Sequence, residues 1–148
     1  MFVRNSLVRR ALGPPIHRKI EFAWCIKLSF SDLDVLTVYR SPNEQYKSQS
    51  HYLTFVDMIN SILGPCNTKP TVICGDFNFN YWKEPNNPVR VMLGKRGFSQ
   101  VVDIPTNIYG TVIDHVYVKG IEQKHHLHYP YYSDHEAVCV RLKYNVPK

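Results

Sequence analysis

Apolar and polar residues alternate along much of the chain with a period near two, which is typical of β-strands. Residues 21–30 (EFAWCIKLSF) and 34–40 (DVLTVYR) alternate in this way and are separated by a polar turn. They predict two strands joined as a hairpin. A short apolar run from Pro70 to Cys74 predicts a buried strand that ends abruptly at Gly75-Asp76. Three further strands are expected at residues 98–102, 112–118 and 137–142.

Two other segments carry apolar residues at spacings of three and four. Between Glu44 and Leu63 these residues fall on one face of a helix, which Gly64-Pro65 ends. A short helix is expected between Pro88 and Gly97, because proline suits a first helical turn and glycine the position past the last. Helices interleaved with strands predict a layered α/β domain.

The composition is that of an ordinary globular domain. The chain has 148 residues, of which 44% are hydrophobic and 20% charged, enough for one buried core. No apolar run approaches the roughly 20 residues of a membrane helix, and none forms a secretory signal. We therefore expect no membrane association and an intracellular location, nuclear or cytoplasmic.

The net charge of +6 is concentrated at the start of the chain. Residues 1–20 hold five basic groups and no acid, which leaves 13 basic and 12 acidic residues in the remainder. The charge therefore says little about a DNA-binding face. We expect residues 1–20 to be a basic, poorly ordered segment and residues 21–148 to form the domain. A mitochondrial transit peptide is an alternative for this start, although an interdomain stretch or an arbitrary gene start is preferred.

Four polar clusters stand where predicted strands end. They are YRSPN at 39–43, GDFN at 75–78, IDH at 113–115 and SDH at 133–135. Each cluster alone is as well explained by a turn or a helix cap. Four such clusters in order favour a functional site, because a carboxylate at the end of a buried strand is held rigidly and faces a cleft.

These residue types suit the hydrolysis of a phosphodiester. A hard cation such as Mg²⁺ takes carboxylate and amide oxygens and neutralises phosphate charge. Asp76 and Asn78 are two residues apart, so in an extended chain they face one side and share water activation and phosphate orientation. Asp114 and His135 form a possible pair in which the carboxylate holds the imidazole towards a phosphate oxygen. Further oxygen ligands and donors are offered by Asp134 and Tyr39.

Together the clusters resemble the endonuclease/exonuclease/phosphatase superfamily. The T-x-x-x-G-x-x-x-D-H pattern from Thr106 to His115 strengthens the resemblance, which covers about residues 20–145. The phrases VYRSPN and YYSDHEAV look most like nuclease domains of non-long-terminal-repeat retroelements and Helitron-like elements. The resemblance implies a four-layer α/β/β/α sandwich, as in deoxyribonuclease I. Its first strands, one with a metal-orienting Asn and one ending in a metal-binding Glu, have no counterpart here, so the chain is expected to be N-terminally incomplete.

The resemblance also implies roles for the motif residues. Asp76 matches the water-activating carboxylate, and Asn78 matches its orienting amide. Asp114 matches the partner of the catalytic histidine, His135. Tyr39 matches the phosphate-contacting tyrosine. His115 follows Asp114 and is expected to face the other side of its strand as a structural residue.

The remaining matches concern substrate and metal. Asn43 is expected to line the same cleft and Thr106 to contact substrate, while Arg40 either contacts phosphate or covers the sheet edge. Asp134 matches a metal-site carboxylate. The implied function is hydrolysis of DNA phosphodiesters with Mg²⁺ or Mn²⁺ by the endonuclease domain of a mobile element. The alternatives are a catalytically inactive fragment that at most binds nucleic acid or a partner, and a phosphatase of the same fold.

Overall fold

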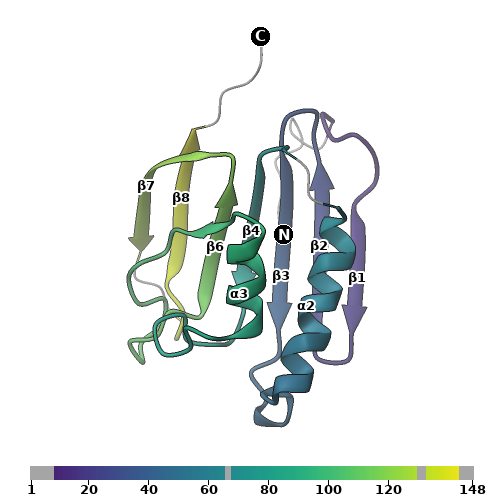
Figure 1. Cartoon of the computed structure of the whole chain (residues 1–148). Helices are drawn as coiled ribbons and strands as arrows, with labels where there is room; N and C mark the ends of the chain where they lie inside the picture. The colour runs from purple at the N-terminus through teal and green to yellow at the C-terminus, as the bar shows by residue number, and fades with distance from the viewer. Residues whose placement is uncertain (1–8, 66–67, 130–132, 144–148) are drawn as a thin grey trace.

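The computed structural model describes residues 9–65, 68–129 and 133–143, and for 123–129 only the backbone. Six strands form one sheet in the order β1-β2-β3-β4-β6-β5 (Figure 1). Their bounds are β1 Ile16–Ile20, β2 Ala23–Ser29, β3 Asp34–Arg40, β4 Thr71–Asp76, β5 Ser99–Gln100 and β6 Asp114–Lys119. Neighbouring strands are antiparallel except β3 and β4, which are parallel.

Two helices cover one face of this sheet (Figure 1). A short 3-10 turn, η1 (Glu44–Tyr46), leads into α2 (Gln49–Leu63), and α3 (Pro88–Lys95) lies beside α2. The expected helix from residue 44 is divided because the Ser48 side chain accepts a hydrogen bond from the His51 N–H and caps α2. As the crossover between parallel strands, α2 buries its apolar stripe on the sheet. This core includes Leu36, Val38, Phe55, Ile59, Ile73 and Phe77.

A second, two-stranded sheet packs on the opposite face. It consists of β7 (Glu122–Tyr129) and β8 (Ala137–Lys143), paired antiparallel. Its side chains at Val138, Val140 and Leu142 contact a second core that includes Val72 of β4 and Val116 of β6. Within the described residues, the helices, the six-stranded sheet and the second sheet therefore form three stacked layers, and the predicted layered α/β domain is confirmed.

The sheet begins earlier than the sequence pattern suggested. Strand β1 places Ile16–Ile20 in register with Lys27–Ala23 of β2, within the segment expected to be poorly ordered. That expectation is corrected for residues 16–20. The reason it failed is that β1 is an edge strand whose side chains are mostly exposed, so it lacks the apolar alternation of a half-buried strand. Residues 1–8 lie outside the described ranges.

In the parts of the chain that the structure describes, no helix combines the length and apolar character needed to cross a membrane.

Candidate active site

Two carboxylates lie side by side on the face of the sheet that points away from α2 and α3. Asp76 is the last residue of β4 and Asp114 the first of β6, and the two are directly paired in the antiparallel register. Strand alternation puts them on the same side as Val72 and Val116 of the second core. Both side chains are partly exposed, so they are open to a ligand.

His135 joins this pair from the segment that precedes β8. Its Nδ1 lies 2.9 Å from Oδ2 of Asp114. Ligand atoms of Asp76, Asp114 and His135 lie within 4.8 Å of one another. A cleft of about 220 Å³ borders the two carboxylates and is also lined by Glu136 and Val138. Residues far apart in sequence thus form one acidic and imidazole cluster at a cleft.

The cluster perturbs the acidity of its own members. Burial, and then the charge of Asp114, raise the pKa of Asp76 from 3.8 to about 6. Burial alone lowers the pKa of His135, but the hydrogen bond and charge of Asp114, together with the charges of Asp76 and Asp134, raise it above its ordinary 6.5. A carboxyl group and an imidazole whose pKa values are both raised by their neighbours at one cleft are suited to proton transfer.

The raised pKa of Asp76 has a consequence for stability without metal. The protonated side chain of Asp76 stabilises the metal-free fold. This stabilisation is fully present below about pH 4 and is lost as the pH rises through about 6, where the carboxylate ionises in the folded state. Asp76→Asn is therefore expected to raise the free energy of unfolding well above pH 6, by roughly 1–2 kcal/mol after allowance for solvent screening. The gain should vanish near pH 4. Urea unfolding in EDTA at both pH values checks this, and an equal effect at both would contradict it.

The GDFN segment turns sharply after β4 and fixes Asp76. Gly75 has φ +149°, and a Cβ there would lie 1.8 Å from the carbonyl oxygen of Val38. Asn78 has φ +50°, and its backbone N–H donates to Oδ1 of Asp76 at 3.0 Å. The Asn78 side-chain amide donates to the carbonyl oxygen of Arg40 at 2.6 Å. Asn78 therefore orients Asp76 through its backbone and ties the turn to β3 through its side chain.

Arg40 was expected to contact phosphate or to cover the sheet edge, and the structure corrects both expectations. Its side chain is 0% exposed on the helix side of the sheet. The guanidinium donates to the carbonyl oxygens of Asn78 (3.2 Å) and Tyr46 (2.6 Å) and lies over the ring of Tyr52. The reason is strand alternation, since Arg40 follows Tyr39 and must face the opposite side. Arg40 holds the turn after β4 against η1 and α2.

Thr106 also differs from its expected role as a substrate contact. It is fully buried, and its hydroxyl oxygen accepts the backbone N–H groups of Ile113 and Asp114, each at 3.1 Å. Its carbonyl oxygen accepts the N–H of Glu136 at 2.8 Å. Thr106 thus links the start of β6 to the segment that carries His135, and it is a positioning residue.

Removing this hydroxyl is expected to disturb both stability and the site. Thr106→Val leaves two partly buried N–H groups, those of Ile113 and Asp114, without this acceptor, which costs about 1–3 kcal/mol. It should also loosen the Asp114–His135 pair, whereas Thr106→Ser keeps the hydroxyl and should restore the pair. Chemical denaturation measures the first effect, and the pKa of His135 by NMR measures the second. A valine variant as stable as the wild type would show that the link is dispensable.

The remaining predicted residues take different places. Tyr39 is the register partner of Asp76 across β3 and β4, and its ring stacks on Trp24 with centroids 5.8 Å apart. Asn43 is exposed in the loop after β3, where its side chain accepts the N–H of Gln45 and caps η1. Asp134 is exposed beside His135, and its carbonyl oxygen accepts the N–H of Ile108. The structure thus brings Tyr39 to the cluster, with Asp134 at its rim.

Two neighbours of the motifs complete the picture. Glu136 lines the cleft although sequence reasoning did not single it out, and its position directly after SDH was the available signal. His115 lies on the other face, as alternation predicts, fully buried with Nε2 within hydrogen-bond distance of the carbonyl oxygens of Phe79 and Val112. Burial lowers the pKa of His115 to about 4, so it stays neutral and structural.

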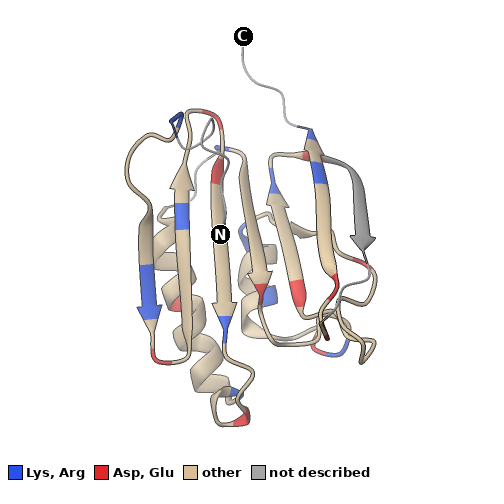
Figure 2. Ribbon diagram, turned by 180° about the vertical axis from the view of Figure 1, so that it is seen from behind, with Lys and Arg blue, Asp and Glu red and all other residues tan. Residues whose placement is uncertain are grey.

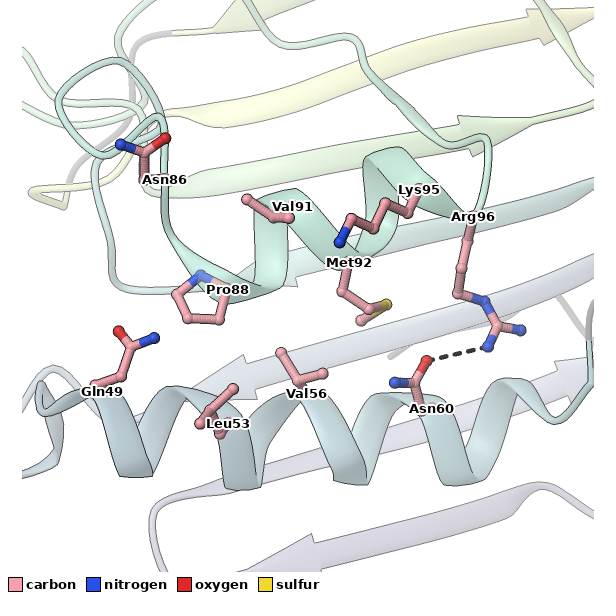
Figure 3. Close-up of a pocket in the computed structure, with 10 residues that line it drawn as sticks. All are labelled: Gln49, Leu53, Val56, Asn60, Asn86, Pro88, Val91, Met92, Lys95 and Arg96. Carbon is pink, nitrogen blue, oxygen red and sulfur yellow. Dashed lines mark hydrogen bonds between the residues drawn. The ribbon is translucent and has the colours of Figure 1, made fainter.

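A larger groove on the helix side does not carry comparable chemistry. It measures about 610 Å³ and lies between α2 and α3 (Figure 3). Exposed Leu53 and Val91 line it, and the Arg96 guanidinium donates to the Asn60 side chain at one end. Its lining contains amides and cations but no carboxylate, imidazole or thiol. The cluster on the opposite face is therefore the candidate active site.

Comparisons with known proteins agree with this geometry. The model of the Endonuclease/Exonuclease/phosphatase family matches residues 3–135. No curated protein sequence matches the chain. Among solved structures, the human Nocturnin catalytic domain with bound sulfate anion aligns with a TM-score of 0.65 at 13% identity, over 93% of this chain and 61% of that one.

Two further solved structures of this fold carry different names, one a phosphatase domain and the other an endonuclease domain. The inositol polyphosphate 5-phosphatase domain of SPsynaptojanin, in complex with inositol (1,4)-bisphosphate and calcium ion, aligns with a TM-score of 0.62 at 18% identity, over 91% of this chain and 55% of that one. The endonuclease domain of TRAS1, a telomere-specific non-LTR retrotransposon, aligns with a TM-score of 0.54 at 16% identity, over 84% and 65%. The chain thus spans between 55% and 65% of the length of these three structures.

At these identities the structural likeness shows the fold, and it confirms the predicted deoxyribonuclease-I-like sandwich. Together with the family model, which covers most of the sequence, it establishes that the chain belongs to the Endonuclease/Exonuclease/phosphatase family.

Proposed function

We propose that this chain carries the phosphate-cleaving site of a DNA endonuclease of the mobile-element type, which hydrolyses phosphodiester bonds with the help of Mg²⁺ or Mn²⁺. The observation that carries the proposal is the 2.9 Å contact between His135 Nδ1 and Asp114, beside Asp76. Phosphodiester hydrolysis needs an activated water and hydrogen-bond donors for the charge that develops on phosphate. The cluster offers groups for both tasks.

Each residue takes a role that its contacts support. Asp114 accepts the Nδ1–H of His135, so that Nε2 of the protonated ring can donate to a phosphate oxygen. The raised pKa of His135 favours the protonated, donating form. Asp76, held by the backbone N–H of Asn78, takes a proton from the attacking water. Tyr39, beside Asp76 in the register, offers its phenolic O–H to the same phosphate.

The donor set also suits a divalent cation. Mg²⁺ and Mn²⁺ prefer carboxylate oxygens, and Asp76 and Asp114 present two of them on one face of the sheet. The exposed carboxylate of Asp134 is a further candidate ligand at the rim. Bound there, the cation would neutralise phosphate charge and help to ionise the attacking water.

DNA is the proposed substrate because the phrases VYRSPN and YYSDHEAV are similar to retroelement nuclease domains, and TRAS1 is one of the structures of like fold. A phosphatase of the same fold is the second candidate, since the SPsynaptojanin domain aligns with a higher TM-score than TRAS1. The third is an inactive fragment that binds nucleic acid or a partner.

One experiment separates these candidates. The purified chain is incubated with supercoiled plasmid or with inositol (1,4)-bisphosphate, in Mg²⁺, Mn²⁺ or EDTA, and nicking and phosphate release are measured. The proposal expects metal-dependent nicking that Asp76→Ala abolishes, with the exposed carboxylate variant Asp57→Asn as a matched control. Phosphate release without nicking would support the phosphatase. Activity in neither assay would support the inactive fragment.

A further inference from the structure

The turn that follows β4 is held in one way at its ends and in another at its middle. At one end the Phe77 N–H donates to the carbonyl oxygen of Ile113 at 2.9 Å. At the other end the Tyr81 N–H donates to the carbonyl oxygen of Val112, also at 2.9 Å. Between them lies Asn78, whose φ of +50° is a left-handed conformation that residues with a side chain rarely adopt. Such a conformation persists only where the surrounding groups impose it.

Two side chains from outside the turn bind its middle. The guanidinium of Arg40, at the end of β3, donates to the carbonyl oxygen of Asn78 at 3.2 Å. The carbonyl oxygen of Arg40 accepts the Asn78 side-chain amide at 2.6 Å. Two residues further on, the Asn80 N–H donates to Oε1 of Glu84 at 3.2 Å. Arg40 and Glu84 therefore hold the part of the turn that its backbone bonds to Ile113 and Val112 do not reach.

Tyr52 of α2 connects these two side chains. The Arg40 guanidinium lies over its ring, 4.3 Å from the centroid, and its hydroxyl donates to Oε2 of Glu84 at 3.3 Å. The same carboxylate accepts the side-chain amide of Asn87, the residue that caps α3, at 3.0 Å. Arg40, Tyr52 and Glu84 thus form one continuous set of contacts beneath the turn, which we call the anchor network.

The anchor network keeps a cation where a cation is costly. Arg40 is fully buried, its Nε has no hydrogen-bond partner among the described residues, and burial lowers its pKa. An apolar side chain would fill the same space without the cost of taking a charge out of water. The planar guanidinium does what an apolar side chain cannot, because it reaches the carbonyl oxygens of Asn78 and Tyr46 at once.

The anchor network lies directly behind the candidate active site. Arg40 ends β3 on the helix side of the sheet, and Asp76 ends the neighbouring strand β4 on the opposite face. Seen from behind, the basic end of β3 meets the acidic end of β4 and the acidic start of β6 at this edge of the sheet (Figure 2). The bend at Asn78 is the link between the two sides, since its backbone N–H donates to Oδ1 of Asp76.

We propose that the anchor network is a positioning device for Asp76, and this rests on the proposed function. Arg40 and Glu84 impose the bend in the turn, and Tyr52 holds these two side chains together. The bend places the Asn78 N–H on the Asp76 carboxylate, which is thereby aimed at the attacking water. The network lies on the far side of the sheet from the scissile phosphate, so it governs the rate of the chemical step and not the binding of substrate.

Kinetics of plasmid nicking test this role. Glu84→Ala is expected to lower kcat by about 10–100-fold and to leave KM for plasmid unchanged, because a misaimed catalytic group slows the chemistry alone. Glu84→Gln keeps an oxygen that accepts the Asn80 N–H, so it should restore most of the rate. The matched control is Glu44→Ala, which removes the exposed carboxylate that pairs with Lys47 in η1 and should leave both constants unchanged.

Hydrogen exchange of the metal-free chain, followed by NMR, tests the geometry without any activity. Glu84→Ala should speed exchange of the Asn78 amide several-fold. The Val101 amide, which donates to the carbonyl oxygen of Val116 outside the turn, should be unchanged. Tyr52→Phe keeps the ring under Arg40 and removes only the hydroxyl, so it should show a smaller change of the same sign. Combined with Glu84→Ala it should add no further loss, because both changes act through one carboxylate.

The outcomes separate this proposal from the proposed function. Faster Asn78 exchange that Glu84→Gln reverses, in a chain that does not nick plasmid, supports the anchor network and counts against the nuclease. Unchanged Asn78 exchange in both Glu84→Ala and Tyr52→Phe overturns the anchor network even if nicking is found. Equal acceleration at Val101 would also overturn it, because Glu84 would then stabilise the whole fold and not this turn.

Discussion

Replacing His135 by Asn is expected to lower metal-dependent plasmid nicking by about 10²–10⁴-fold, the contribution typical of a positioned acid or base. The asparagine side chain cannot carry a proton to the phosphate, although it occupies a similar space. The fold should survive, because His135 is partly exposed and contributes to neither apolar core. Initial rates of nicking, measured beside circular dichroism spectra, check both statements.

Asp114→Asn should reduce nicking to a similar extent, because the amide no longer holds Nδ1 of His135 in its donating form. The double variant should be no slower than the slower single variant, since residues that act as a unit show strongly non-additive losses. The exposed Asp57→Asn variant controls for loss of a carboxylate elsewhere. Additive losses from Asp114→Asn and His135→Asn would mean that the two residues act independently.

Adding one methyl group at Gly75 is expected to unfold the domain or to cost more than about 4 kcal/mol of its stability, beyond the usual range for a single substitution. The new Cβ would lie 1.8 Å from the carbonyl oxygen of Val38, an atom of the backbone that cannot move without separating β3 from β4. The backbone at Gly75 also has φ +149°, which residues with a side chain rarely adopt. Urea unfolding followed by tryptophan fluorescence measures the loss.

Gly94→Ala is the matched control for Gly75→Ala. Gly94 lies in α3, and a Cβ there would meet nothing within 4 Å. The helix should therefore gain about 0.5–1 kcal/mol from the alanine. Equal stability of Gly75→Ala and Gly94→Ala would contradict the close approach of β4 to β3 at Gly75. It would also contradict the placement of Asp76 beside Tyr39, which depends on that approach.

The sequence predicted the central elements because their patterns are strong. Strand β3 matches the expected residues 34–40, and α2 ends at Leu63 before the predicted Gly64 stop. Asp76 and Asp114 were predicted at strand ends and are found there. Such features follow from local periodicity and turn chemistry, which a single sequence carries.

Contacts between distant segments could not be predicted in the same way. The sequence does not state that Thr106 accepts the N–H of Asp114, or that the guanidinium of Arg40 binds the carbonyl of Tyr46. The side on which Arg40 lies was predictable, because it follows Tyr39 in a strand and must face away from it. The register that aligns Trp24 with Tyr39 was not, since it depends on how the hairpin pairs.

The central claim is that Asp114 and His135, 21 residues apart, meet at one site. Its most direct measurement is the pKa of His135, obtained by NMR titration of the metal-free chain and of Asp114→Asn. The geometry predicts a pKa above 6.5 in the wild type that falls in the variant, because the carboxylate that favours the charged imidazole is gone. The same pKa in both proteins would mean that the two side chains do not interact, and the proposed site would have to be abandoned.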